Sequence, residues 1–331
     1  MSEKDFCQLL MVGIIGEELS AFEQAAFKRY PPGGVILFAR NCLNPDKTRL
    51  LVAKLQEISL AVSGLPLVVA IDQEGGRVRR LRAGFPDFLG AAALGAENDL
   101  AKTRSTAVGL ARALLDIGIN CNLAPVADLY KKGSQVLSGR CFGTDSDLVA
   151  RQVATCIEGL QETGLAACVK HFPGHGTVID DSHKKLPVSQ LQREELKPHL
   201  EPFIRAVDVG VKLMMAAHLR FPQIDSHSVP FSALFLREIV RLELGFNGVL
   251  LSDDLDMAAV ADRPLAEVMA AGLKAGLDMA LWGRNLMPVI DPAPVCADFC
   301  RQMRAHFPDS EYLQVKIDRV RRLREGFCKN G

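Results

Sequence analysis

The chain has 331 residues, of which 48% are hydrophobic and 24% are charged, so it can bury a large core. Lysine plus arginine and aspartate plus glutamate both number 39, and the formal net charge is therefore zero. This balance excludes the chain-wide basic excess that is typical of nucleic-acid-binding proteins.

The N-terminal twenty residues carry acidic side chains ahead of a short apolar run and no small-residue cleavage site, which argues against a signal peptide. No apolar run approaches the roughly 18–20 residues that span a bilayer. The nine cysteines lie mostly in apolar stretches, which favours buried thiols in a reducing compartment over disulfides. We therefore expect a cytoplasmic protein, monomeric, that binds neither membrane nor nucleic acid.

Short apolar runs alternate with amphipathic segments along the chain. The runs predict strands at residues 9–15, 33–39, 65–72, 119–128, 165–170, 211–218, 248–254 and 277–283. Because most of them are apolar throughout, they are typical of parallel strands that are covered on both faces. The amphipathic segments predict helices at residues 17–30, 44–62, 98–118, 146–164, 189–210, 232–245 and 263–276.

Eight strands with intervening helices favour an α/β fold of the (β/α)8 barrel type, with residues 1–331 forming a single domain. Residues 285–331 add two further helices after the last strand. A doubly wound open sheet is the alternative. The strand count and the lack of a G-x-G-x-x-G motif after the first strand disfavour it.

Polar residues gather where the predicted strands end, which is where a parallel barrel places its active site. This position is shared by Asp72, Gln73, Glu74, Asp128, Lys170, His171, His218, Asp253, Asp254 and Trp282, and the loop after the fourth strand carries Arg140. Their recurrence at one predicted rim indicates an enzyme, since a purely structural sheet would spread such residues.

Asp253 and Asp254 directly follow the apolar run that ends in Ser252. Adjacent residues of a strand point to opposite sides, so one carboxylate could face a pocket while the other bonds to the backbone. Alternatively, both could cap the segment that follows. A pocket-facing aspartate at this place could be a nucleophile, a base or a metal ligand.

The stretch Lys170–His183, with the sequence KHFPGHGTVIDDSH, contains three histidines interrupted by a proline and two glycines. These breakers rule out a regular helix, which His171 and His175 would need to converge on a zinc ion. One interpretation is a polar loop whose histidines bond to the backbone. In another, Asp181 accepts one ring N–H of His183 and leaves the other nitrogen for proton transfer near neutral pH.

Asp72 and Arg80 flank a Gly-Gly turn in an arginine-rich segment. This segment could be a solvated basic rim. Functionally, the Asp72 carboxylate suits vicinal sugar hydroxyls, and arginines suit hydroxyl or carboxylate contacts. Trp282, the single tryptophan, could form an apolar wall beneath a sugar or belong to the core.

Four motifs together resemble the bacterial β-N-acetylglucosaminidases of glycoside hydrolase family 3. They are DQEGGRV (72–78), SGRCFG (138–143), KHFPGHG (170–176) with DSH (181–183), and SDDLDM (252–257), in the order found in that family. The resemblance extends over most of residues 5–285 and implies a single (β/α)8 barrel. The glycine before Arg140 and the cysteine after it depart from the family's usual pattern.

The resemblance also implies the site. Asp253 matches the nucleophile, and His183 matches the general acid/base with Asp181 as its partner. Sugar-binding positions match Asp72, Arg80, Arg140, Lys170 and His171. No metal and no cofactor is implied. The expected function is a retaining exo-β-N-acetylglucosaminidase that acts on peptidoglycan-derived muropeptides in cell-wall recycling.

Three alternatives remain open at this point. The first is a β-glucosidase or xylosidase of the same family, although those usually carry a second domain that supplies a carboxylic acid. The second is a metal-dependent hydrolase that uses the histidine cluster. The third is a non-catalytic sugar-binding barrel.

Overall fold

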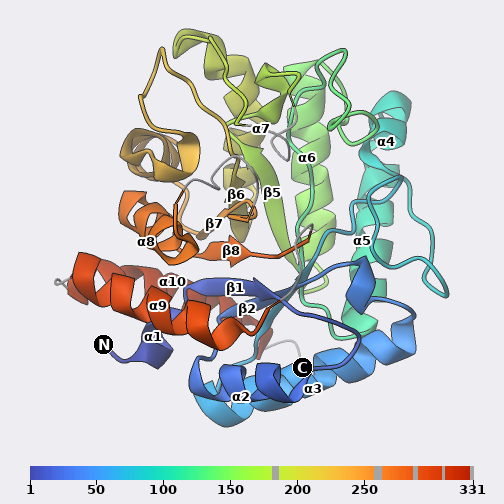
Figure 1. Cartoon of the computed structure of the whole chain (residues 1–331). Helices are drawn as coiled ribbons and strands as arrows, with labels where there is room; N and C mark the ends of the chain where they lie inside the picture. Colours follow the sequence, from blue (N-terminus) through green and yellow to red (C-terminus); the bar gives the residue numbers. More distant parts are fainter. Residues whose placement is uncertain (181–185, 257–262, 286–289, 308–309, 329–331) are drawn as a thin grey trace.

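In the part of the chain that the structure describes, eight parallel strands form the centre of the molecule (Figure 1). The computed structural model describes residues 1–331 except 181–185, 257–262, 286–289, 308–309 and 329–331. The strands are β1 (Leu10–Gly13), β2 (Gly34–Leu37), β3 (Val68–Ile71), β4 (Cys121–Asn122), β5 (Ala166–Phe172), β6 (Leu213–Ala216), β7 (Val249–Ser252) and β8 (Ala280–Trp282). All eight fall within the ranges predicted from the apolar runs or extend them by at most two residues.

The strands hydrogen-bond in the order β7-β6-β5-β4-β3-β2-β1-β8. Because β1 pairs with both β2 and β8, Val12 lies opposite Val35 on one side and Trp282 on the other. A parallel bridge between Leu251 and Met279 joins the remaining two edges. The predicted (β/α)8 barrel is thus confirmed, and the open sheet is not formed.

Helices surround the strands (Figure 1). The α-helices are α1 (Glu3–Cys7), α2 (Ala21–Arg29), α3 (Pro45–Ser63), α4 (Ala91–Glu97), α5 (Leu100–Asp116), α6 (Ser146–Gln161), α7 (Lys197–Asp208), α8 (Leu265–Ala275), α9 (Pro292–His306) and α10 (Ser310–Phe327). Short 3-10 turns occur at η1 (Ala39–Asn41), η2 (His175–Thr177), η3 (Glu194–Leu196) and η4 (Val229–Phe231), and η5 (Leu234–Glu243) is a π-helix. No helix among the described residues is long and apolar enough to cross a membrane.

Helix starts are fixed by local side-chain caps. Ser20 and Glu23 form a reciprocal capping box at the start of α2, and the carboxylates of Asp99 and Asp145 accept amide N–H groups at the starts of α5 and α6. Such caps satisfy amide groups that have no partner within the helix.

The C-terminal helix α10 is tied to the opposite end of the barrel by a buried arginine. Arg324 is fully buried, and its guanidinium donates to the carbonyl oxygens of Leu65 and Pro66 at 3.0 and 2.7 Å. It also donates to Gln8 and to two serine hydroxyls of α3. Leu65 and Pro66 precede β3, so these bonds lie at the amino ends of the strands, leaving the carboxyl ends to the loops.

Candidate active site

The carboxyl ends of β3 and β5 bring two carboxylates and a lysine into contact. Asp72 is the first residue after β3, and Lys170 lies within β5. The Nζ atom of Lys170 is 2.8 Å from Asp72 Oδ1 and 2.7 Å from Glu74 Oε1. One ammonium group therefore joins two acidic residues that lie two positions apart on the same strand end.

Two arginines extend this ion-pair network outward. Arg80 Nη2 lies 3.0 Å from Asp72 Oδ2. Arg140 binds Glu74 in a bidentate manner, with Nε 2.8 Å from one carboxylate oxygen and Nη2 2.7 Å from the other. The order Arg80–Asp72–Lys170–Glu74–Arg140 alternates in charge along its whole length, so each buried charge has an opposite neighbour.

The alternating charges determine the pKa values of the two carboxyl groups and of the lysine. Burial alone would raise the pKa of the Asp72 carboxyl, but the charges of Lys170 and Arg80 outweigh it and hold that pKa well below its usual range. Burial likewise acts on Glu74, and Arg140 with Lys170 lowers its pKa to about 2. Burial lowers the pKa of Lys170, yet the two carboxylates raise it overall. Asp72, Glu74 and Lys170 are therefore all ionised at neutral pH.

A buried aspartate next to this network holds two histidines, His171 at the end of β5 and His175 at the start of η2. Asp128 is fully buried, and its Oδ2 atom is 2.7 Å from Nδ1 of His171. Its other oxygen accepts the backbone N–H of His175 at 2.6 Å. The carboxylate fixes the Nδ1–H form of His171, whose Nε2 is the remaining polar atom of the ring. Asp128 itself has a lowered pKa, because the two histidines outweigh its burial.

The end of β7 carries the pair Asp253 and Asp254. The backbone N–H of Asp253 donates to the carbonyl of Ala216 in β6 at 3.0 Å. The backbone N–H of Asp254 donates to Oδ1 of Asp253 at 2.8 Å. The Asp254 side chain instead accepts two backbone N–H groups, from Gly283 at 2.9 Å and from Asp256 at 3.2 Å. The two neighbouring carboxylates thus make different contacts.

Burial also affects the titration of Asp254. It raises the pKa of this carboxyl to about 6, the charges of Asp253 and Asp256 add to the effect, and the two donated N–H groups oppose it. A carboxyl group with such a pKa changes its charge in the range where a neutral-pH enzyme works.

Trp282 belongs to the core. Its side chain is only 3% exposed, and its indole N–H donates to Oδ2 of Asp256 at 3.0 Å. The same oxygen lies 3.3 Å from Nη1 of Arg284. Of the two interpretations made from the sequence, the core position describes this side chain better, and Asp256 holds its polar edge.

The structure brings most of the sequence-predicted residues to one end of the barrel. Asp72, Arg80, Arg140 and Lys170 form a single ion-pair network together with Glu74, and His171 follows Lys170 directly. Asp253 lies at the same end of the barrel, directly after β7. Asp181 and His183 lie outside the described residues.

Two residues in this site received no role from the sequence. Glu74 links Lys170 to Arg140, and Asp128 binds the ring of His171 and the backbone N–H of His175. Both lie at the ends of predicted strands, and this position was the sequence signal that could have assigned them to the site. Their partners, however, come from distant parts of the chain.

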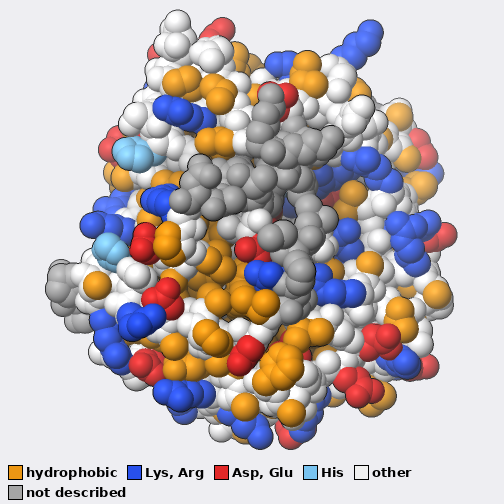
Figure 2. Space-filling view, in the orientation of Figure 1, with side chains coloured by type: hydrophobic (Ala, Val, Ile, Leu, Met, Phe, Trp, Pro, Cys, Tyr) orange, Lys and Arg blue, Asp and Glu red, His pale blue; other side chains and the backbone are white. Residues whose placement is uncertain are grey.

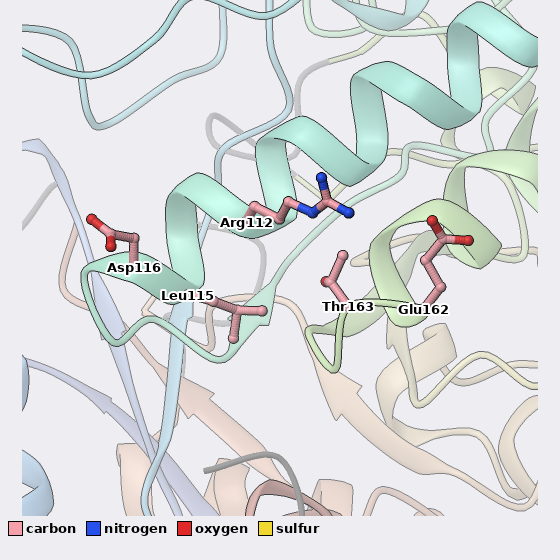
Figure 3. A pocket seen from close by; sticks show the side chains of 5 residues that line it. All are labelled: Arg112, Leu115, Asp116, Glu162 and Thr163. Atoms are coloured by element: carbon pink, nitrogen blue, oxygen red, sulfur yellow. The ribbon is translucent and has the colours of Figure 1, made fainter.

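A separate surface hollow of about 440 Å³ lies between the ends of α5 and α6 (Figure 3). Its lining includes Asp116, which pairs with Arg49 at 2.9 Å, and Glu162, which pairs with Arg104. These charged groups are engaged in surface ion pairs, and the hollow lies on the helical layer outside the barrel. We therefore place the candidate active site at the strand ends.

Comparison with known proteins gives a family and close structural relatives. Residues 1–311 match the Glycosyl hydrolase family 3 N terminal domain. A β-hexosaminidase of Thiobacillus denitrificans is 38% identical over 280 residues, which cover 82% of this chain and 77% of that protein.

Two solved structures have a similar fold. The glycoside hydrolase family 3 β-N-acetylglucosaminidase from Paenibacillus sp. str. FPU-7 matches with a TM-score of 0.93 and 31% identity. The match covers 100% of this chain but 63% of the Paenibacillus chain, so this chain spans less than two thirds of that protein. NagZ from Neisseria gonorrhoeae, solved in complex with N-trifluoroacetyl-D-glucosamine, matches with a TM-score of 0.80 and 30% identity, covering 95% of this chain and 89% of that chain.

Proposed function

This chain belongs to glycosyl hydrolase family 3 and is a β-hexosaminidase, and we propose that it removes terminal, non-reducing N-acetylglucosamine with retention of configuration. The observation that carries the proposal is the ionised network Arg80–Asp72–Lys170–Glu74–Arg140 at the barrel end where Asp253 also lies. A fixed set of charged donors and acceptors next to a carboxylate suits the recognition of a neutral, hydroxyl-rich sugar.

Asp253 would act as the nucleophile. Its carboxylate attacks C1 of the sugar and forms a covalent glycosyl-enzyme while the bond from C1 to the leaving oxygen breaks. His183, with Asp181 as its partner, donates the proton that the leaving oxygen takes up. The same histidine then removes a proton from water, which attacks C1, releases the sugar and frees Asp253. An imidazole with an unperturbed pKa of ~6.5 suits both steps.

The sugar ring would be held by Asp72, Arg80, Arg140, Lys170 and His171. Each oxygen of Asp72 accepts one bond from Lys170 or Arg80, so each keeps a lone pair for a sugar hydroxyl. The cations next to it donate to hydroxyl or carbonyl oxygens. Because the network is already assembled, binding does not require these long side chains to be ordered first.

For the natural substrate we propose muropeptide fragments from peptidoglycan recycling, in the cytoplasm. The support for this finer assignment is the motif resemblance to family members with that role. It predicts faster release of N-acetylglucosamine from an anhydromuramyl disaccharide than from an N-acetylglucosamine disaccharide. Equal rates on the two would reject the muropeptide assignment and leave the glycosidase assignment in place.

The test of the activity compares p-nitrophenyl N-acetylglucosaminide with p-nitrophenyl glucoside, and locates the label left by a fluorinated N-acetylglucosaminide that forms a long-lived glycosyl-enzyme. We expect turnover of the first substrate and a label on Asp253. Preference for the glucoside would overturn the substrate, and a label on another residue would overturn the nucleophile. Loss of activity with a chelator and recovery with zinc would favour a metal-dependent hydrolase, and binding of the sugar without turnover would favour a sugar-binding barrel.

A further inference from the structure

The turn that follows β7 has a bonding partner for every backbone N–H group from Ser252 to Leu255. Ser252 and Leu255 donate to the carbonyls of Met279 and Leu281 on the β8 side, at 3.2 and 2.9 Å. Between them, Asp253 donates to β6, and Asp254 donates to the Asp253 carboxylate. The proposed nucleophile therefore receives a hydrogen bond from the amide of its own neighbour.

The direction of that amide depends on how Asp254 is held. Oδ1 of Asp254 accepts the N–H groups of Gly283 at 2.9 Å and of Asp256 at 3.2 Å, which joins the turn to the residue directly after β8. The backbone carbonyl of Asp254 accepts from Nε2 of His218 at 3.0 Å. Asp254 is thus fixed from both neighbouring sides of the barrel.

The place occupied by the Asp254 side chain requires a glycine opposite it. A Cβ atom on Gly283 would lie 2.8 Å from Oδ2 of Asp254 and 2.7 Å from Cζ of Phe38. Gly283 is itself held, because its carbonyl accepts from Nη2 of Arg40 at 3.0 Å. The absence of a side chain at position 283 lets the carboxylate approach the backbone closely enough to accept the N–H.

We propose that Asp254 is a positioning residue for the glycosidase reaction: by accepting the Gly283 and Asp256 amides, its carboxylate fixes the backbone N–H that aims the carboxylate of Asp253. The inference rests on the proposed role of Asp253 as nucleophile. Nucleophilic attack needs the reacting oxygen to stand about 3–3.5 Å from C1 in an aligned position, and an error of about 1 Å costs on the order of 10²-fold in rate. In this role Asp254 acts through Asp253.

The proposal predicts that the reaction needs the hydrogen-bond acceptor of the Asp254 side chain but not its negative charge. Asparagine keeps an oxygen that can accept both amides but has no charge, whereas alanine has neither. We expect Asp254→Asn to keep kcat within about tenfold of the wild type and Asp254→Ala to lose on the order of 10²-fold, with KM nearly unchanged in both. The rate of glycosyl-enzyme formation should fall by the same factor as kcat.

Asp278→Asn is the matched control for a buried aspartate. Oδ2 of Asp278 accepts the backbone N–H of Leu250 within β7 at 2.9 Å, so this residue also bonds to β7, on the side away from Asp253. We expect this variant to unfold more easily but to keep the wild-type kcat and labelling rate.

A second pair of variants tests the same contact from the other side. Gly283→Ala should lower kcat as Asp254→Ala does, because the methyl group displaces the carboxylate. Gly16→Ala should not, since a Cβ at that position meets no atom within 4 Å.

Several results would overturn the proposal. These are an Asp254→Ala enzyme with wild-type kcat, an Asp254→Asn enzyme as slow as the alanine variant, or an equal loss in Asp278→Asn. Labelling of the wild type and of Asp254→Ala distinguishes a wrong nucleophile from a wrong role for Asp254. A label away from Asp253 rejects the proposed nucleophile, whereas a label on Asp253 that forms at the wild-type rate in Asp254→Ala rejects only the role of Asp254.

Discussion

Lys170 shows how single residues set the chemistry of the candidate site. It is 2% exposed and lies within hydrogen-bonding distance of two carboxylates, Asp72 and Glu74. Two ionised carboxylates so close together would repel each other, and burial would favour their neutral forms. The lysine keeps both charged, so each member of the network depends on the next.

The ionised network makes the stability of the fold depend on pH. The pKa values of Asp72 and Glu74 are lower in the folded chain than the ordinary values of about 4, so their ionised forms stabilise the fold above that range. The stabilisation is lost as pH falls below about 4.5, first through the folded pKa of Glu74 at about 2 and then through the still lower pKa of Asp72. Urea unfolding at a series of pH values should show this fall. A Glu74→Gln variant should show a smaller fall, and parallel curves would contradict the prediction.

Glu74→Gln should also change substrate binding. Arg140 loses a bidentate anionic partner and Lys170 loses one of its two carboxylates, so the two cations that we propose to hold the sugar are displaced. We expect KM for p-nitrophenyl N-acetylglucosaminide to rise about tenfold or more, with a smaller change in kcat. Glu158→Gln is the control, because its pair with Arg104 is half-exposed and should contribute little. Equal KM values in the two variants would exclude a role for Glu74.

At the scale of elements, the eight strands and most helices could be predicted from the sequence, because buried parallel strands are apolar throughout. The bounds were less predictable. The predicted strand 119–128 is reduced to Cys121–Asn122, since side-chain amides replace part of the ladder. Asn120 bonds to the N–H of Val69 and Asn122 to the N–H of Gln73, at 2.8 and 3.0 Å.

The helix predicted at residues 189–210 begins only at Lys197. Pro198 stands in its first turn, where a missing N–H is tolerated, and this signal was present in the sequence. Pro202, one turn later, leaves the carbonyl of Pro198 without its helical donor, and the hydroxyl of Ser146 bonds to that oxygen at 2.6 Å. This second partner comes from another helix, so no local pattern could have predicted it.

Among the residues of the candidate site, too, the positions could be predicted from local sequence, whereas the contacts between distant residues could not. The positions of Asp72, Lys170 and Asp253 at one barrel end could be predicted because they follow or end apolar strands, and Arg80 and Arg140 were candidates from the loops after two of the predicted strands. The ion-pair partners could not be predicted. Glu74 meets Arg140 across 66 positions of sequence, and Asp128 meets His171 across 43. Such pairs form only when the barrel closes.

Close packing between α4 and the loop that carries Arg140 gives a prediction at this scale. A Cβ on Gly95 would lie 1.7 Å from the carbonyl oxygen of Phe142, two residues after Arg140. Gly95→Ala should therefore shift this loop, raise KM and destabilise the fold by about 1–3 kcal/mol. Gly326→Ala, a helical glycine with open space, should be neutral or stabilising by up to about 1 kcal/mol. Kinetics and urea unfolding of both variants check this, and an unchanged Gly95→Ala would contradict it.

For the whole molecule, the balance of charge seen in the composition is also visible on the surface. Basic and acidic side chains are interspersed over the face shown in Figure 2, with apolar side chains scattered between them. That face carries no extended field of one sign, in keeping with 39 residues of each charge. Electrostatic attraction of a strongly charged partner over a distance is therefore not a feature of this face.

The whole barrel also depends on Arg324, which ties α10 to Gln8 and to the residues ahead of β3. Arg324→Lys keeps the charge but loses the planar group that reaches several acceptors at once. We expect a loss of about 2–4 kcal/mol in unfolding free energy, with kcat and KM at 25 °C unchanged, because the contact lies at the barrel end away from Asp253. The exposed Arg322→Lys is the control, and should unfold as the wild type does. Thermal unfolding with kinetics on the same samples tests both parts.

The pairing of β1 with β8 has a consequence for how the protein is made. The partner of Leu10–Gly13 on that side is Ala280–Trp282, about 270 residues later in the sequence. A ribosome that adds about 5–20 residues per second needs roughly tens of seconds to pass from one strand to the other. Throughout that time the nascent chain has a strand edge with unbonded N–H and C=O groups. The barrel can therefore close only after translation has passed Trp282.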